Sequence, residues 1–401
     1  MSITTLTLSM NAYPSGPEPW RRPRPRPTAR VACLVCLLAL APSLAADDAV
    51  RLEIDTSEAD AVLAILARRS AGQTVSDPDW QRLFESAAYR RLKQRETEMK
   101  RPFEDAEFRE FVLSDALLKR RQELDQTLAA WKRIDLETSA RSVLGYLPSR
   151  AKIRAKVFPV IKPKTNSFVF DLKGDPTIFL YVDPAVTAEQ FASTVRHELH
   201  HIGLGSALSE KQLEDLPPAA KGAAGWMGAF GEGMAMLAAA GGPDIHPHAN
   251  SSPEDKARWD RDVANFAQDL RTVERFFLDI IDGRIKEDAA REKGFSFFGV
   301  QGPWYTVGWK MAVIVEQTYG RAILVECMRD PRRLLATYNS AVKSRKGSGH
   351  LPLWSTRLLR AVGAEPASFA AEEGGFKRLR RPMGLSCLDG ASPPRAVPGS
   401  P

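Results

Sequence analysis

Apolar and charged residues alternate at helical spacing through the first hundred residues after position 50. Residues 59–69 (ADAVLAILARR) form a compact apolar segment. Residues 79–98 and 104–135 carry more charge but keep apolar residues three and four positions apart, which a helix would place on one face. The pattern predicts that residues 50–145 are helical, with the charge runs on solvated faces.

The pattern changes near residue 152, where polar and apolar residues begin to alternate singly. Residues 152–161, 167–172 and 177–182 are rich in β-branched and aromatic side chains, which is typical of strands. The last two segments are separated by the turn sequence Lys173-Gly-Asp-Pro176. We therefore expect a small sheet in this part of the chain.

A long helix is predicted directly after these strands. Asp183-Pro184 ends the last strand, and Thr187 with Gln190 fits a capping box that would open a helix. That helix would run to about Gly203 or Gly205. Helical patterns then recur to about residue 372, at 223–240, 257–282, 303–319, 321–328 and 331–343.

These patterns predict a mainly α-helical α+β protein in which a small β-sheet precedes the long helix and the C-terminal half is helical. The expected divisions are a leader (1–46), a helical N-terminal region (47–150), a domain of sheet plus helices (151–375) and a flexible tail (376–401). The tail carries prolines and glycines without periodicity.

The net charge of +7 lies at the two ends of the chain. Residues 1–45 and residues 376–401 each carry +4, which leaves −1 for residues 46–375. A near-neutral body gives no electrostatic reason to expect a nucleic-acid-binding domain.

The N-terminus has the pattern of a secretory signal. Arginines precede the eleven apolar residues Val31–Ala41, and Pro42-Ser-Leu-Ala-Ala46 follows them as a small-residue cleavage site. Eleven residues are too few to span a bilayer as a helix. We expect a secreted or periplasmic bacterial protein with no stable membrane span once the signal is removed. In that compartment Cys327 and Cys387 could form a disulfide, or remain two thiols.

The candidate chemistry lies in His197-Glu198-Leu199-His200-His201, inside the long predicted helix. Histidines four residues apart occupy the same helix face, so His197 and His201 can bind one metal ion. Glu198 is rotated by about 100° from His197, beside the metal, where it can accept a proton from water. Zinc suits this role because it lowers the pKa of a bound water to about 7. His200 is expected to flank the site, and a solvated helix with incidental histidines is the alternative to a metal site.

A catalytic zinc usually has three protein ligands, so a third is expected downstream. The candidates are Glu210, Glu214, Glu232, Asp244, His246 and His248. Glu232 is favoured because it lies in Gly231-Glu-Gly-Met-Ala-Met-Leu237, a helix of small and apolar residues. A lone carboxylate would be costly to bury there unless it were paired or bound to a metal. An exposed glutamate on a packed helix is the other interpretation.

Together, HELHH and GEGMA resemble the gluzincin metallopeptidases, in which two histidines and a glutamate bind zinc. The chain is also similar to a family of exported bacterial proteins classed as zinc-dependent peptidases, through residues 54–63, both motifs and Trp304–Ala312. The resemblance implies zinc ligands at His197, His201 and Glu232 and a general base at Glu198. The chain departs from thermolysin-like members, because Met236 occupies the place of their aspartate and the spacing between the motifs is longer.

Peptide hydrolysis also needs a hydrogen-bond donor for the developing oxyanion. Tyr305 is the candidate, since it would open a helix after the loop Gly299–Pro303, and an ordinary packed aromatic is the alternative. The sequence thus predicts an exported zinc metallopeptidase acting on a peptide or protein substrate. The alternatives are a zinc hydrolase of a non-peptide amide or ester, and a non-catalytic binding protein stabilised by zinc. A fourth protein ligand from His246 or His248 would favour the non-catalytic protein.

Overall fold

The computed structural model describes residues 49–366 except for residues 173, 209–212 and 346–349. These residues belong to one compact unit. The predicted leader (1–46) and tail (376–401) lie outside the described residues, as does Cys387. Cys327 is buried, and its pairing with Cys387 stays a prediction.

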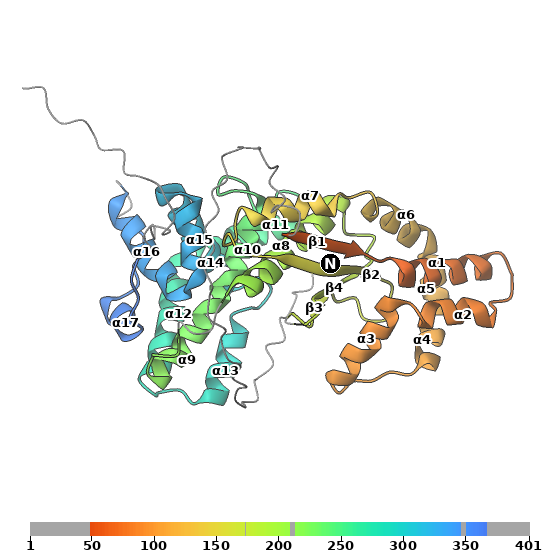
Figure 1. Cartoon of the computed structure of the whole chain (residues 1–401), viewed down its shortest axis with the longest axis horizontal. Coiled ribbons are helices and arrows are strands. Elements are labelled where there is room, and N and C mark those ends of the chain that lie inside the picture. The colour runs from red at the N-terminus through yellow and green to blue at the C-terminus, as the bar shows by residue number, and fades with distance from the viewer. Residues whose placement is uncertain (1–48, 173, 209–212, 346–349, 367–401) are drawn as a thin grey trace, which may run out of the picture. The chain divides into compact units, whose positions relative to one another are not determined.

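Four strands form one mixed sheet (Figure 1). They are β1 (Val50–Ile54), β2 (Ile153–Val160), β3 (Phe168–Phe170) and β4 (Thr177–Tyr181), in the order β1-β2-β4-β3. Strand β2 pairs in parallel with β1 and β4, and β3 pairs antiparallel with β4. The sheet joins the start of the described chain to its middle, because β1 and β2 are about 100 residues apart.

Strand β1 corrects the expectation that residues 50–145 are helical throughout. Its five residues (VRLEI) include β-branched side chains, and each aligns with a residue of β2, from Val50 with Ile153 to Ile54 with Val157. A segment this short takes its structure from its partner strand, which local periodicity does not reveal.

The helices that follow β1 are shorter and more numerous than their apolar spacing predicts. They are α1 (Ser57–Ser70), α2 (Asp77–Phe84), α3 (Ala87–Glu98), α4 (Asp105–Val112), α5 (Asp115–Lys119), α6 (Arg121–Trp131) and α7 (Leu136–Leu144). New helices begin at serine caps, where Ser86 Oγ accepts a hydrogen bond from the Tyr89 backbone N–H and Ser114 Oγ accepts one from Leu117.

The predicted long helix is α8 (Ala188–Ala207). The helices after it are α9 (Pro218–Met227), α10 (Gly231–Ala240), α11 (Pro253–Ala264), α12 (Phe266–Ile281), α13 (Glu287–Ser296), α14 (Pro303–Tyr319), α15 (Arg321–Arg329), α16 (Pro331–Ser344) and α17 (Thr356–Ala361). The single helix expected over 223–240 is instead two helices joined by the 3₁₀ turn Gly228–Phe230, where glycines weaken the α-helix.

The prediction of a mainly helical α+β fold with a small sheet before a long helix is confirmed. Its buried apolar residues form two clusters. One contains the sheet, the N-terminal helices and the inner face of α8, and the other contains the helices from α9 onward. Leu204 of α8 packs against both. Among the helices that the structure describes, none combines the length and the apolar character needed to cross a bilayer.

Candidate metal centre

Helix α8 begins at a capping box and presents His197 and His201 on one face, because residues four positions apart lie on the same side of a helix. Thr187 Oγ1 accepts a hydrogen bond from the Gln190 N–H at 3.2 Å, and Gln190 Oε1 accepts one from the Thr187 N–H at 2.8 Å. The helix then continues without a break past His197 and His201. The two histidines, four residues apart in the sequence, therefore lie about one helical turn apart on α8.

Helix α10 brings Glu232 to these histidines and is held closely against α14. A Cβ atom added to Gly233 would lie 2.0 Å from the backbone nitrogen of Trp309, and one added to Gly308 would lie 2.6 Å from the carbonyl oxygen of Phe230. Only glycine permits this approach of two helix backbones. The small residues that marked this segment in the sequence thus fix the position of Glu232.

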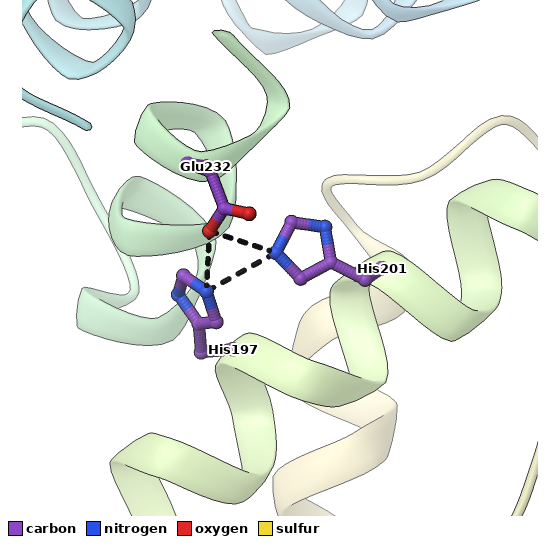
Figure 2. A group of neighbouring side chains, drawn as sticks. All are labelled: His197, His201 and Glu232. Atoms are coloured by element: carbon purple, nitrogen blue, oxygen red, sulfur yellow. Dashed lines mark hydrogen bonds and ion pairs between the residues drawn. The ribbon is translucent and has the colours of Figure 1, made fainter. Parts of the chain in front are cut away.

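Three side-chain atoms converge in this place, as Figure 2 shows. His197 Nε2 lies 3.1 Å from His201 Nε2 and 3.1 Å from Glu232 Oε2, and His201 Nε2 lies 3.2 Å from Glu232 Oε2. Two ligand atoms on one tetrahedral zinc ion, each bonded at about 2.0–2.1 Å, are about 3.3 Å apart. The donor set and its spacing therefore fit zinc, with a fourth position left for water or substrate.

Glu232 is only 3% exposed, yet its pKa is lowered. Burial favours the neutral carboxylic acid, but the charge of His201 and the hydrogen bonds with His197 and His201 outweigh burial. Glu232 is therefore an anion suited to ligating a cation.

Glu198 lies beside this cluster and is 1% exposed. Its Oε1 atom has no hydrogen-bond partner among the described residues. Burial raises its pKa, and the negative charge of Glu232 adds to this effect, while His197 and His201 oppose it. A carboxylate with an unused oxygen next to a metal site can accept a proton from a bound water.

Tyr305 contacts the cluster from α14. Its ring is stacked on that of His197, with centroids 6.2 Å apart and planes 17° apart. Burial raises the pKa of Tyr305, and the charges of Glu232 and Glu198 together with a hydrogen bond to Glu232 raise it further. The hydroxyl therefore keeps its proton and can act as a hydrogen-bond donor.

A cleft of about 140 Å³ opens beside these residues. His197, Glu198 and Tyr305 are part of its lining. The rest is formed by the N-terminal half of α8, the C-terminal half of α10, the loop 245–251 and Gln301. A substrate could thus reach the base and the hydrogen-bond donor from one cavity.

The other predicted ligand candidates that the structure describes are not part of the three-residue cluster. Glu214 is exposed, Asp244 accepts a hydrogen bond from Gln317, and Glu210 lies outside the described residues. His246 interacts with Asp260 at 2.9 Å, and His248 Nδ1 with Ser251 Oγ at 2.9 Å.

His200 is fully buried behind the cluster, and burial lowers its pKa well below its usual value of 6.5. The sequence reasoning did not single out Arg196 or Gln301, which are among the polar residues of the cleft wall. Their signals were weak: Arg196 directly precedes His197, and Gln301 lies in the loop before Tyr305.

Comparisons with known proteins are consistent with this centre. The family model described as "Putative zinc dependent peptidase (DUF5700)" matches residues 80–347, about two thirds of the chain. The match spans both histidines, Glu198, Glu232 and Tyr305. No curated protein and no solved structure shows significant similarity to the chain. The cofactor prediction is confirmed at this level, since the family is described as zinc dependent and a three-residue cluster can hold the metal.

Proposed function

We propose, on the premise that the chain belongs to this family of zinc-dependent peptidases, that it hydrolyses peptide bonds at the centre formed by His197, His201 and Glu232. One observation carries the proposal. Three donor atoms converge from α8 and α10 at 3.1–3.2 Å, and a buried carboxylate with an unused oxygen, Glu198, lies beside them. Zinc bound there would act as a Lewis acid and lower the pKa of a bound water to about 7.

The chain's own residues would move the protons. Glu198 accepts a proton from the attacking water and delivers it to the leaving amine as the carbon–nitrogen bond breaks. Tyr305 donates a hydrogen bond from its hydroxyl to the carbonyl oxygen as negative charge develops there. When zinc is bound, His197 and His201 would hold it as neutral imidazoles, and Glu232 would supply negative charge that balances the metal.

The ligand set of two histidines and one glutamate corresponds to the gluzincin type of peptidase. Met236 lies four residues after Glu232, so an aspartate like that of thermolysin-like enzymes is absent from this position. Export belongs to the same proposal and rests on the basic, apolar and small-residue pattern of residues 1–46. The substrate would then be a peptide or protein met outside the cytoplasm.

A catalytic centre fits better than a structural one. Structural zinc sites usually have four protein ligands, whereas the cluster found among the described residues has three. A structural site also has no use for a buried carboxylate in the position of Glu198.

The test is Glu198→Gln, which removes the base and keeps the size of the side chain. We expect the variant to keep about one zinc per chain and to lose 10²- to 10⁴-fold in kcat on a peptide substrate chosen from a library. Glu189→Gln is the matched control, since Glu189 is an exposed glutamate on the same helix. Equal activity of Glu198→Gln and wild type would refute the mechanism, and a wild type active only on non-peptide esters or amides would refute the substrate class.

A further inference from the structure

Arg196 lines the cleft beside the metal centre without a carboxylate partner. Its Nε donates a hydrogen bond to the backbone oxygen of Ala239 at 2.9 Å. Among the described residues, no Asp or Glu lies within ion-pair distance of its guanidinium. A half-buried arginine without a counterion is uncommon, because removing its charge from water is costly unless the charge is paired.

The charge pattern of the cleft sets Arg196 apart. Apart from the histidines and Tyr305, only Arg196 and Glu198 among the residues that line the cleft have ionisable side chains. Burial lowers the pKa of His248 to about 4, so this histidine is neutral. Glu198 lies at the catalytic end and is committed to proton transfer. His246, which also lines the cleft, interacts with Asp260. Arg196 is therefore the permanent cation that the lining offers to a ligand.

The position of Arg196 along the cleft can be estimated from α10. Ala239 follows Glu232 by seven residues, so both lie on the same face of α10, about 10 Å apart along its axis. Helices α8 and α10 are antiparallel here, since Glu232 meets His201 and His197 while Ala239 meets Arg196. The Ala239 carbonyl and the guanidinium bound to it therefore lie roughly 10 Å from Glu232, measured along the axis of α10.

This distance corresponds to a definite length of substrate. Extended peptide covers about 3.3–3.6 Å per residue, so about 10 Å is spanned by three residues, or by two residues and an acidic side chain. The polar side chains of Ser193, Thr194 and Asn250 line the same cleft and could hydrogen-bond the connecting peptide. The guanidinium, which holds Ala239 O through Nε, keeps its other N–H groups for a ligand, and their planar fork matches a carboxylate.

We propose that Arg196 binds a carboxylate of the peptide substrate two to three residues from the cleaved bond and so determines specificity. This inference rests on the proposed peptidase function. The carboxylate comes either from an acidic side chain or from the C-terminus of the substrate. The competing explanation is structural: Arg196 satisfies a carbonyl in the last turn of α10 and does nothing more.

The experiment uses acetylated, amidated hexa-alanine peptides that carry one Glu or one Gln at each position in turn, together with the same all-alanine peptide as free acid or amide. We expect zinc-loaded wild type to prefer the carboxylate member of one pair by about 10- to 100-fold in kcat/KM, the range for a hydrogen bond to a charged group. A preferred Glu position identifies a side chain, and a preferred free acid identifies the C-terminus. In Arg196→Gln the ratio of kcat/KM between the carboxylate peptide and its neutral partner should fall toward one, and Arg196→Lys should restore part of this preference.

Arg150→Gln is the control for the structural explanation. Arg150 donates from Nε and Nη2 to the backbone oxygen of Ala207 at 3.0 and 2.6 Å, so it satisfies the end of α8 much as Arg196 satisfies the end of α10. It does not line the cleft. If Arg196→Gln lowered kcat/KM equally for both members of every pair, as a structural change would, the inference would be overturned.

A binding measurement separates this inference from the proposed function. Zinc-loaded Glu198→Gln is titrated calorimetrically with the same peptide pairs. If wild type cleaves no peptide, the proposed function fails. The role of Arg196 would still be supported if Glu198→Gln bound the carboxylate peptide of one pair more tightly and the double variant Glu198→Gln/Arg196→Gln did not. The inference fails if wild type cleaves both members of every pair equally well. It also fails if Glu198→Gln binds both members of every pair equally well, and neither result depends on whether the proposed function holds.

Discussion

Two buried glutamates, Glu232 in α10 and Glu58 in α1, show opposite electrostatic behaviour. Glu232 is 3% exposed and Glu58 is 0% exposed, so burial alone would keep both neutral. The pKa of Glu232 is nevertheless lowered, whereas that of Glu58 is raised to about 8. The difference must come from their neighbours.

The neighbours of Glu232 are two imidazoles that converge on one carboxylate oxygen at 3.1 and 3.2 Å. Glu58 has fewer polar partners. Its Oε2 accepts a hydrogen bond from the Ile161 backbone N–H at 3.0 Å, and its Oε1 has no partner among the described residues. Burial dominates its pKa, which the hydrogen bond and the charge of Lys162 only partly offset.

The comparison teaches that burial of an acidic residue does not by itself indicate a functional site. Glu58 ties α1 to the end of β2 through one backbone group, which is a structural task. Glu232 belongs to a set of convergent donors from two helices, with room for an ion between them. Convergence of donor atoms distinguishes the two sites.

Replacing each glutamate by glutamine tests this distinction, and the largest effect is expected at Glu232. A neutral amide is a poor zinc ligand and leaves only two imidazoles. Glu232→Gln should therefore lose zinc on dialysis and fall by more than about 1,000-fold in peptidase activity, a loss of over 4 kcal/mol in transition-state stabilisation. Metal content by atomic absorption and hydrolysis of the best library peptide are the measurements.

Glu58→Gln is the control for that experiment, since it removes a carboxylate of equal burial. It should keep about one zinc per chain and the wild-type rate. If Glu232→Gln also kept one zinc per chain after dialysis, Glu232 would not be a ligand and the distinction between the two glutamates would be lost.

Local sequence rules sufficed for much of the metal centre. The spacing of His197 and His201 and the capping box at Thr187 depend only on neighbours in the chain. Glu232 came from a general energetic argument, that a lone carboxylate is costly in an apolar helix. The same argument could not have been applied to Glu58, because the charged residues around it in the sequence suggest an exposed helix face.

The remaining features depend on contacts between distant segments. Strand β1 needs β2, about 100 residues later, before its five residues can pair. Arg196 donates to the Ala239 carbonyl, a backbone group that every residue type carries, so the sequence does not predict this contact. The helix breaks at Ser86 and Ser114 could have been found, since serine is a common N-cap, but the continuous apolar spacing concealed them.

The position of Glu232 depends on the close packing of α10 against α14, and Gly233→Ala tests this dependence. An added Cβ at Gly233 would lie 2.0 Å from Trp309 N and 2.5 Å from Tyr305 O, which are backbone atoms that cannot move aside alone. Helix α10 would have to shift away from α14, and Glu232 with it. We expect a loss of about 3 kcal/mol in the free energy of unfolding, measured by denaturant titration, and weaker zinc binding.

Gly231→Ala is the matched control two residues away. Nothing lies within 4 Å of a Cβ built there, so alanine should be neutral or stabilise the helix by up to about 1 kcal/mol. Equal stability of Gly233→Ala and Gly231→Ala would mean that the close packing of α10 on α14 does not hold Glu232 in place.

The smallest expected effect concerns Glu58 and pH. Its pKa is about 8 in the folded protein and about 4.5 in the unfolded chain, so the folded state binds this proton more tightly. The stability it contributes is complete below pH 4.5 and is lost as the pH rises through 8. Between pH 7 and pH 9, wild type should lose about 1 kcal/mol of unfolding free energy relative to Glu58→Gln, which cannot titrate.

Burial lowers the pKa of the neighbouring Lys162 to about 7. Its titration acts in the opposite direction, because stability lost below pH 7 returns as the pH rises. The charge of Glu58 also raises the pKa of Lys162. The difference between the urea unfolding curves of the two proteins at pH 7, 8 and 9 therefore reports the titration of Glu58 together with its coupling to Lys162. Glu53→Gln, which removes an exposed glutamate of β1, should follow wild type across this range. Parallel curves for wild type and Glu58→Gln would mean that Glu58 ionises normally, and that burial without convergent donors does not hold a carboxyl group neutral in this fold.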